Sequence, residues 1–255
     1  GDIVRDAMLF HSHFIPEEDK VAGAKAMLTL LSDGLAASNP LRPSLINAVN
    51  QLRKQNDYYI AHEYLETFNN PCYFVEFADM ATQAGLSYIS DSEPRLDMAA
   101  SFGNNVQLNH SLLAMGQNRL MRQQYLDFAV GRNFRKSMLS HVEQEEKIAG
   151  PDLAKLGDLH YAGRFLPAKA DEGAADNVTF FLDHRGNKIA YSDPAMIAIL
   201  EALQGAWPKA IAGTELLRLA EQTGESKPEN ALQKLFYLGR HYLCRDASDI
   251  PAVLQ

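Results

Sequence analysis

Apolar residues recur at helical spacing through most of the first 140 positions, and this periodicity constrains the fold more than any other feature of the chain. Between positions 3 and 31, for example, Val21, Ala24, Leu28 and Leu31 fall three or four residues apart. Pro16 and the acidic residues after it suit a helix start, and Gly34 suits the end of that helix. The first part of the chain is therefore predicted to be a mainly helical domain.

The same spacing predicts further helices and leaves room for one short strand at 86–89, after Gly85. These helices are expected over 45–52, 56–68, 73–84, 112–128 and 132–139. Asn56 is expected to cap the second of them, and Asn70-Pro71 separates the second from the third.

The pattern changes at Val178, where two strand-like runs, 178–182 and 188–191, flank the turn sequence Arg185-Gly186-Asn187. Three helices are expected after them, followed by a strand at 242–244 that returns to the sheet, which is the element order of a winged-helix domain. The predicted fold class is mainly α with a minor α+β part. We expect a helical domain over 1–166, a linker over 167–177 and a small winged-helix-like domain over 178–255.

Charge argues against binding to nucleic acid. The chain carries 24 Lys and Arg against 32 Asp and Glu, a net charge of −8, and the last predicted helix offers only Lys234 before Arg240. A winged-helix domain that makes protein contacts is the favoured interpretation, and a nucleic-acid-binding or transcriptional regulator is the alternative.

Glycine and cysteine spacing excludes several cofactor sites. The closest of the 16 glycines are six positions apart, so the Gly-x-Gly turn of dinucleotide and S-adenosylmethionine loops is absent, and no cofactor site is expected in this chain. Cys72 and Cys244 lie too far apart in sequence for a Cys-x-x-Cys site, which favours a cytoplasmic protein. No apolar run is long enough for a membrane span, and the start at Gly1 suggests a fragment of a longer protein.

Histidine pairs are the obvious candidates for metal or acid–base chemistry. His11 and His13 have no third ligand at a recognisable spacing, and His62-Glu63 lacks the second histidine of a His-Glu-x-x-His helix. No metal site is predicted, and His62 is interpreted as a partly buried, hydrogen-bonded side chain. A hydrolase or metal enzyme that uses these histidines stays a third hypothesis.

Two other clusters have a structural and a functional interpretation. The aromatic run 73–77 can line a groove, but packing in a core is favoured. The basic run 132–136 can bind an acidic partner, but a solvent-exposed start of a helix is favoured.

Five motifs together resemble the methyltransferase regulatory domain family, which follows the S-adenosylmethionine-binding domain in bacterial methyltransferases. They are Arg5-Asp6-Ala7-Met8-Leu9-Phe10-His11; His62-Glu63-Tyr64-Leu65-Glu66 with Asn70-Pro71-Cys72-Tyr73-Phe74; Ala84-Gly85-Leu86-Ser87-Tyr88-Ile89; Gln124-Tyr125-Leu126-Asp127-Phe128; and Arg132-Asn133-Phe134-Arg135. The resemblance extends to about Leu139, and the unit after Val178 is similar to the C-terminal domain of the same proteins.

The resemblance implies a class I methyltransferase whose catalytic domain, with S-adenosylmethionine, lies upstream of this chain. Related proteins include protein-lysine methyltransferases that modify bacterial outer-membrane proteins. The implied partners are that catalytic domain and a protein substrate, and the resemblance carries over no catalytic residue. Candidates for contact with substrate or with the catalytic domain are His62, Glu63, Tyr64, Asn70, Tyr73, Phe74, Arg132 and Arg135.

Overall fold

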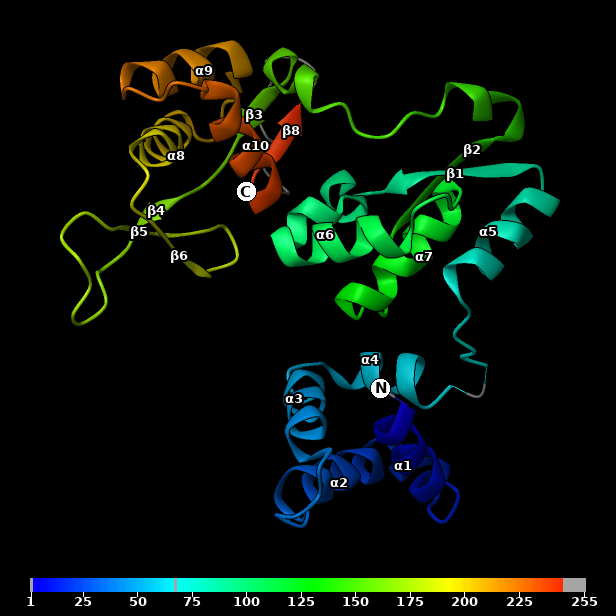
Figure 1. Ribbon diagram of the computed structural model, residues 1–255. Helices are drawn as coiled ribbons and strands as arrows, with labels where there is room; N and C mark the ends of the chain where they lie inside the picture. The colour runs from blue at the N-terminus through cyan, green and yellow to red at the C-terminus, as the bar shows by residue number, and fades with distance from the viewer. Residues whose placement is uncertain (1, 67, 245–255) are drawn as a thin grey trace. The chain divides into compact units, whose positions relative to one another are not determined.

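The computed structural model describes residues 2–66 and 68–244, and the chain divides into two compact units, 1–72 and 73–255 (Figure 1). Both units are built mainly from helices, and the described strands form small antiparallel sheets in the second unit. The predicted class, mainly α with minor β, is confirmed at this level.

The first unit is a small helical cluster. Its elements are α1 (Asp2–Ser12), the 3-10 turn η1 (Glu17–Asp19), α2 (Lys20–Asp33), α3 (Arg42–Leu52), α4 (Asp57–Tyr59) and the π-helical turn η2 (Ile60–Tyr64). Met8, Leu28, Val49 and Ile60 form its core and are at most 1% exposed. These residues come from four helical segments, α1, α2, α3 and η2, so the predicted helical spacing is what fills this core.

One boundary in the first unit differs from the prediction. Asn56 does cap the helix, because its side chain accepts a hydrogen bond from the amide of Tyr59. The helix was expected to reach Phe68, but the helical segment ends at Tyr64, and Phe68 lies outside it with 90% of its surface exposed. Helical spacing of an apolar residue is therefore no guarantee that the residue is packed.

The first half of the second unit has helices beside a two-stranded sheet. Its elements are α5 (Phe74–Gln83), β1 (Leu86–Asp91), the 3-10 segments η3 (Pro94–Asp97) and η4 (Ala99–Phe102), α6 (Asn104–Leu113), α7 (Arg119–Val130), β2 (Ser137–His141), and the 3-10 segments η5 (Val142–Lys147) and η6 (Leu153–Asp158). Strands β1 and β2 are antiparallel, with Leu86 opposite His141 and Asp91 opposite Ser137.

Of two helix predictions in this region, one is wrong in part and the other is wrong. The helix expected over 112–128 is divided between α6 and α7, with Gly116 in the left-handed region at φ 77° between them. The helix expected over 132–139 does not form. Gly131, at φ 62°, ends α7, and the chain then extends and pairs as β2 with β1.

The second half of this unit surrounds a larger core. Its elements are β3 (His160–Ala162), β4 (Leu166–Pro167), β5 (Thr179–Leu182), β6 (Lys188–Tyr191), α8 (Pro194–Ala206), β7 (Ile211–Ala212), α9 (Gly213–Gln222), α10 (Pro228–Leu238) and β8 (Tyr242–Cys244). The predicted hairpin is present as β5 and β6, and its turn contains Gly186 at φ 76°. The predicted strand β8 is also present, but it pairs with β3 rather than with the hairpin.

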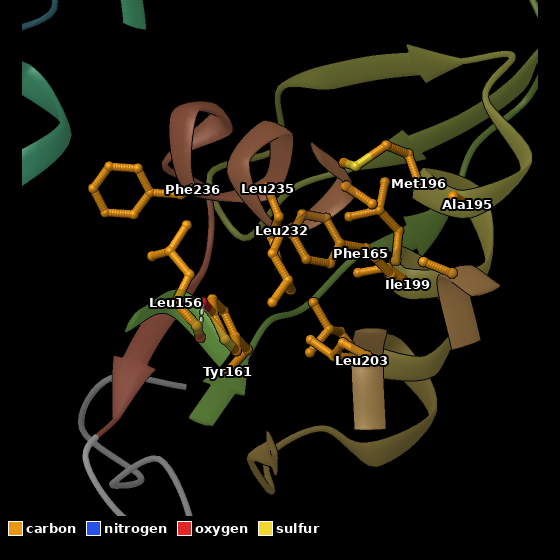
Figure 2. Packing of buried hydrophobic residues seen from close by; sticks show 14 of the residues in the cluster. Leu156, Tyr161, Phe165, Ala195, Met196, Ile199, Leu203, Leu232, Leu235 and Phe236 are labelled. Carbon is orange, nitrogen blue, oxygen red and sulfur yellow. Dashed lines mark hydrogen bonds between the residues drawn. The ribbon is translucent and has the colours of Figure 1, made fainter. Parts of the chain in front are cut away.

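Helices α8, α9 and α10 pack their apolar faces together with residues from the segment before β4 (Figure 2). Tyr161 and Phe165 are fully buried in this cluster, and the hydroxyl of Tyr161 donates a hydrogen bond to the carbonyl of Leu156 at 2.7 Å. Burial of each large apolar side chain contributes about 1.5 to 3 kcal/mol. The core around α8 to α10 thus draws on residues that precede the predicted linker, while the domain limits at 166 and 178 stay a prediction.

Within the described residues, no helix combines the length and the apolar character needed to cross a bilayer.

Candidate functional site

Arg132 and Arg135 lie in a buried ion-pair network with Asp91, Asp97 and Asp127. The two arginine side chains are 8% and 9% exposed, and the three carboxylates are between 2% and 10% exposed. The interpretation of the basic run 132–136 as a solvent-exposed helix start is therefore wrong. Burial of both guanidinium groups is made possible by the three acidic partners.

Local chain geometry brings these five residues together. Asp91 is the last residue of β1, Asp97 is the last residue of η3, and Asp127 lies in the last turn of α7. The left-handed Gly131 ends α7, so that Arg132 follows at once and its amide bonds back to the carbonyl of Asp127 at 2.9 Å. The network thus fastens β1, η3 and α7 to the segment that leads into β2.

Arg135 uses all of its guanidinium nitrogens within this network. Its Nη2 and Nε donate to the carboxylate of Asp127 at 2.7 and 2.9 Å, and its Nη1 donates to Asp97 Oδ1 at 3.1 Å. The same Nη2 also lies 3.0 Å from the side-chain oxygen of Gln123. This two-pronged contact with Asp127 is the strong form of an arginine–carboxylate pair.

Arg132 is held less completely. Its Nε lies 3.2 Å from Asp127 Oδ1, and its Nη2 donates to the carbonyl of Leu96. Its Nη1 lies 3.7 Å from Asp97 and 4.0 Å from Asp91, and this buried atom has no hydrogen-bond partner among the described residues. The contacts at Nη1 are electrostatic attractions rather than hydrogen bonds.

Aromatic rings cover one side of the network. The Arg135 guanidinium carbon lies 4.1 Å from the centre of the Phe74 ring, which in turn packs edge-on against Tyr88 at 4.7 Å. The Tyr88 hydroxyl donates to Asp97 Oδ2 at 2.8 Å and accepts from Arg135 Nη1 at 2.8 Å. Phe74 and Tyr88 are buried, so the core interpretation is confirmed for this part of the aromatic run.

The surroundings of Tyr88 and Arg135 shift the pKa values of both groups. Burial and the charge of Asp97 raise the pKa of Tyr88 far above its ordinary value. Burial lowers the pKa of Arg135, but the hydrogen bond to Asp127 and the nearby carboxylates outweigh this, so its pKa lies above the ordinary value. Tyr88 therefore stays protonated and Arg135 stays charged at neutral pH, which suits these two side chains to positioning rather than to proton transfer.

Two cavities share His110 as a lining residue, and one of them borders this network. One, of about 430 Å³, is lined by Asp97, His110 and Arg119 among other residues. The other, of about 360 Å³, is more apolar and is lined by Leu113 and Phe128, with His110 again at its wall. His110 is 8% exposed, and its Nε2 lies 2.8 Å from the carbonyl oxygen of Arg122. The network thus forms part of the wall of the first cavity through Asp97.

Exposed apolar residues gather on the same helices. Leu108, Leu112 and Met115 follow one another at helical spacing along and just beyond α6 and are between 58% and 71% exposed. Tyr73 is 58% exposed, and its ring meets that of Phe128 edge-on at 5.9 Å. Of the run 73–77, Tyr73 is therefore a surface residue whereas Phe74 is a core residue.

The other sequence-predicted residues belong to the first unit. His62 and Glu63 are exposed on η2, and the His62 ring packs on Tyr58 at 4.2 Å. His62 Nδ1 lies 3.3 Å from Glu66 Oε1, but 51% of its side chain is exposed, so it is hydrogen-bonded as expected without being buried. Tyr64 is half-buried against the unit's core.

Asn70 is exposed and lies outside the helices and strands. The eight candidates therefore fall into two groups, four in each unit. The structure brings Phe74, Arg132 and Arg135 into one cluster and leaves Tyr73 on the nearby surface. Contact of the eight residues with a substrate or a catalytic domain stays a prediction.

Sequence reasoning missed the acidic half of the network. Asp91 and Asp97 lie far from Arg132 in sequence, and no local spacing links them. Asp127 lies in the motif 124–128, but the motif by itself indicates no role for this residue. The sequence signal for acidic partners is the cluster of positive charges at 132–136 in a chain of net charge −8. Such a cluster must lie either in solvent or next to acidic residues.

Among residues 2–66 and 68–244, no group of three or more His, Cys, Asp or Glu is arranged to hold a metal ion.

Comparison with known families matches residues 56–141 to the predicted methyltransferase regulatory domain. All eight sequence-predicted residues and the whole ion-pair network fall inside this segment. The resemblance inferred from the motifs is thereby confirmed.

Comparison with individual proteins gives relatives that are longer than this chain. An uncharacterized protein of Rickettsia prowazekii (strain Madrid E) is 30% identical over 207 residues, which cover 77% of this chain and 36% of the relative. The structure of PKMT2 from Rickettsia typhi is similar with a TM-score of 0.71 and 20% identity over 96% of this chain and 49% of that chain. PKMT2 in complex with AdoHcy gives a TM-score of 0.70 at the same identity and coverage. The chain thus spans about half the length of PKMT2 and shares its fold over that part.

Proposed function

We propose that this chain is the non-catalytic regulatory and substrate-recognition part of an S-adenosylmethionine-dependent methyltransferase, and that the catalytic domain lies outside it. The observation that carries the proposal is the match of residues 56–141 to the methyltransferase regulatory domain. Similarity to PKMT2, which has been solved with AdoHcy, adds support, since this chain spans 49% of that protein. A protein-lysine acceptor and a cytoplasmic location are part of the proposal.

The residues of this chain do not fit the methyl donor. A donor site of the class I type needs a glycine-rich turn after a strand of a parallel sheet. The described strands pair only in the antiparallel sense, and β1 is followed by Ser92 and Glu93 rather than by glycine. The donor therefore belongs to the catalytic domain in this account.

The exposed members of the candidate set are the ones proposed to make contacts. His62, Glu63, Asn70 and Tyr73 are open to solvent, whereas Arg135 is held by its internal partners. In this proposal the buried network stabilises the fold of the regulatory domain, and the exposed residues contact the substrate or the catalytic domain.

The winged-helix-like domain over 178–255 is proposed to serve protein contacts. The order α8, β7, α9, α10, β8 supports this type of fold. Lys234 is the one Lys or Arg of α10, and its ammonium pairs with Asp193. Because the Lys234 ammonium is paired with Asp193, α10 has little positive charge left to bind phosphates. This favours binding of a protein over binding of nucleic acid.

The proposal is tested with the full-length methyltransferase that carries this chain, measured with and without residues 1–255. Transfer of radiolabelled methyl groups to protein is expected to change in rate or in choice of substrate when the chain is removed. Calorimetric titration of the chain alone is expected to show no binding of S-adenosylmethionine. Binding of the donor to the chain alone would contradict its non-catalytic role.

A matched pair of point variants sharpens the test. Tyr73→Ala in the full-length protein is expected to lower methyl transfer to protein, since it removes an exposed ring inside the matched segment. Phe14→Ala removes a ring that is 71% exposed but lies outside that segment, and it is expected to leave the rate unchanged. Equal effects of both variants would remove the support for a contact role of Tyr73.

A further inference from the structure

A third cavity, of about 390 Å³, lies within the 73–255 unit, where the segment after β1 approaches the hairpin turn and the end of α10. Glu93 and Arg95 contribute from the first segment, His184 and Arg185 from the turn between β5 and β6, and His241 from the position just before β8. These residues come from three separated stretches of sequence, and four of the five carry a nitrogen-containing side chain that can donate hydrogen bonds.

Three buried nitrogens around this cavity have no hydrogen-bond partner among the described residues. They are Arg95 Nε, His184 Nδ1 and His241 Nδ1. Arg95 Nε is always a donor, and His184 Nε2 accepts from Arg185 Nε at 3.3 Å, which leaves the ring proton of His184 on Nδ1. A buried polar nitrogen without a hydrogen-bond partner costs about 1 to 3 kcal/mol, so three of them around one cavity need an explanation.

The charge around the cavity favours an anion. Arg95 and Arg185 contribute two positive charges, and Glu93 contributes one negative charge that is shared with Lys136 at 2.9 Å and with Arg95 at 3.0 Å. Burial and the charge of Arg95 lower the pKa of His241 to about 3, so its ring is neutral at pH 7 and can donate one hydrogen bond. The lining is thus positive in a chain whose net charge is −8.

Gly239 is what lets Arg95 lie at this position. The residue follows α10 in the left-handed region at φ 62°, and a Cβ atom there would overlap the Arg95 guanidinium. The absence of a side chain therefore places a guanidinium against the backbone at the wall of the cavity.

We propose that this cavity is a binding site for a small oxyanion, a phosphate or carboxylate group, held by Arg95, Arg185, His184 and His241. An oxyanion offers several acceptors at once, and small rotations of these side chains would bring their unpartnered donors to it. Arginine suits this role because its planar fork matches the geometry of both groups. The site is independent of methyl transfer, so it stands or falls separately from the proposed function.

The test is a calorimetric titration of the 255-residue chain with inorganic phosphate and, separately, with sodium acetate, at constant ionic strength set by sodium chloride. Saturable binding of phosphate alone assigns the site to phosphorylated ligands, and binding of both anions assigns it to oxyanions in general. Saturable binding of acetate alone assigns it to carboxylates. Absence of saturable binding of either anion overturns the proposal.

Point variants locate the binding. Arg185→Gln changes an exposed side chain of the turn and is expected to weaken binding at least fivefold, and His184→Asn is expected to weaken it as well. Arg42→Gln makes the same charge change on an exposed arginine of the first unit and is expected to leave the affinity unchanged. Equal weakening by Arg185→Gln and Arg42→Gln would mean that the anion responds to overall charge, and the site would be withdrawn.

Discussion

Replacement of Arg135 by methionine tests whether the buried network stabilises the 73–255 unit. The guanidinium donates to Asp127, Asp97, Gln123 and the Tyr88 hydroxyl, and it stacks on an aromatic ring. Methionine keeps the bulk of the stem but leaves the two carboxylates without their main partner. Loss of one partner from a buried ion pair costs about 3 to 5 kcal/mol. That is a large part of the roughly 5 to 15 kcal/mol by which folded domains are stable.

Asp127→Asn provides the cross-check for this estimate. In the double variant the carboxylate that faces the missing guanidinium is already neutral, so the double change is expected to cost less than the sum of the two single changes. Arg132 retains its contact with residue 97 in all of these variants, which limits the loss. A double-variant cost equal to the sum would mean that the two residues do not interact.

Urea unfolding followed by circular dichroism, together with hydrogen exchange of amides in β1 and α7, measures the effect both globally and locally. Arg42→Met is the control, because Arg42 is exposed and the expected change there is within about 0.5 kcal/mol. An Arg135→Met variant that loses less than about 1 kcal/mol in both measurements would refute the assignment of Arg135 to a buried network.

Three further predictions concern the second unit. The folded pKa of about 3 for His241 lies below its ordinary value of 6.5, so the unfolded chain takes up a proton between these pH values that the folded chain does not. The free energy of unfolding should therefore fall as the pH falls below 6.5, by about 1.4 kcal/mol per pH unit from this group. Urea unfolding at pH 7, 6 and 5 measures this dependence on pH, which should be weaker in His241→Asn. Leu203→Ala removes a fully buried side chain and should cost about 2 to 5 kcal/mol in the same assay, against less than about 0.5 kcal/mol for the exposed Leu112→Ala. Asp193→Ala should cost about 1 to 2 kcal/mol, because Asp193 caps α8. Burial raises the pKa of Asp193, but its contact with Lys234 and its hydrogen bonds to helix amides outweigh this and lower the pKa overall. The stability contributed by Asp193 should therefore be present above pH 3.8 and be lost in acid. Unfolding of the wild-type chain across pH 5 to 3 measures this loss.

Much of the fold was predictable because its signals are local. The helices α2, α3 and α8 to α10 follow from apolar residues at helical spacing, with a proline in the first turn of α3, α8 and α10 and a glycine just after α2 and α10. The hairpin of β5 and β6 follows from a turn that needs a residue at positive φ, which Gly186 supplies. In each case, residues within one turn or one hairpin decide the structure.

The incorrect predictions concern segments whose structure depends on residues far away in the sequence. The segment 132–139 has a helical spacing, but its extended form allows Ser137 to pair with Asp91 and allows Arg132 and Arg135 to reach their acids. Strand β8 was expected beside the hairpin, but it pairs with β3, a strand that sequence patterns did not indicate. Contacts between residues tens of positions apart leave no periodic signal in a single sequence.

The candidate site was predictable only in part for the same reason. The arginines and the aromatic residue of the network were selected by their motifs, whereas Asp91 and Asp97 had no mark that tied them to Arg132. The candidates also differ in exposure, which residue type alone does not predict. Tyr73 is 58% exposed, whereas the neighbouring Phe74 is 5% exposed. Which residue at the start of α5 is buried depends on the elements that pack against it. Tyr73 contacts Phe128 of α7, and Phe74 contacts Tyr88 of β1.

The central claim is that this chain directs methyl transfer without binding the methyl donor. The most direct measurement is the rate of methyl transfer to protein by the full-length methyltransferase with and without residues 1–255, beside a calorimetric titration of the chain alone with S-adenosylmethionine. The account predicts no donor binding by the chain and a changed rate or substrate choice when the chain is absent. A chain that binds the donor, or a methyltransferase whose rate and substrate choice are the same without it, would contradict the account.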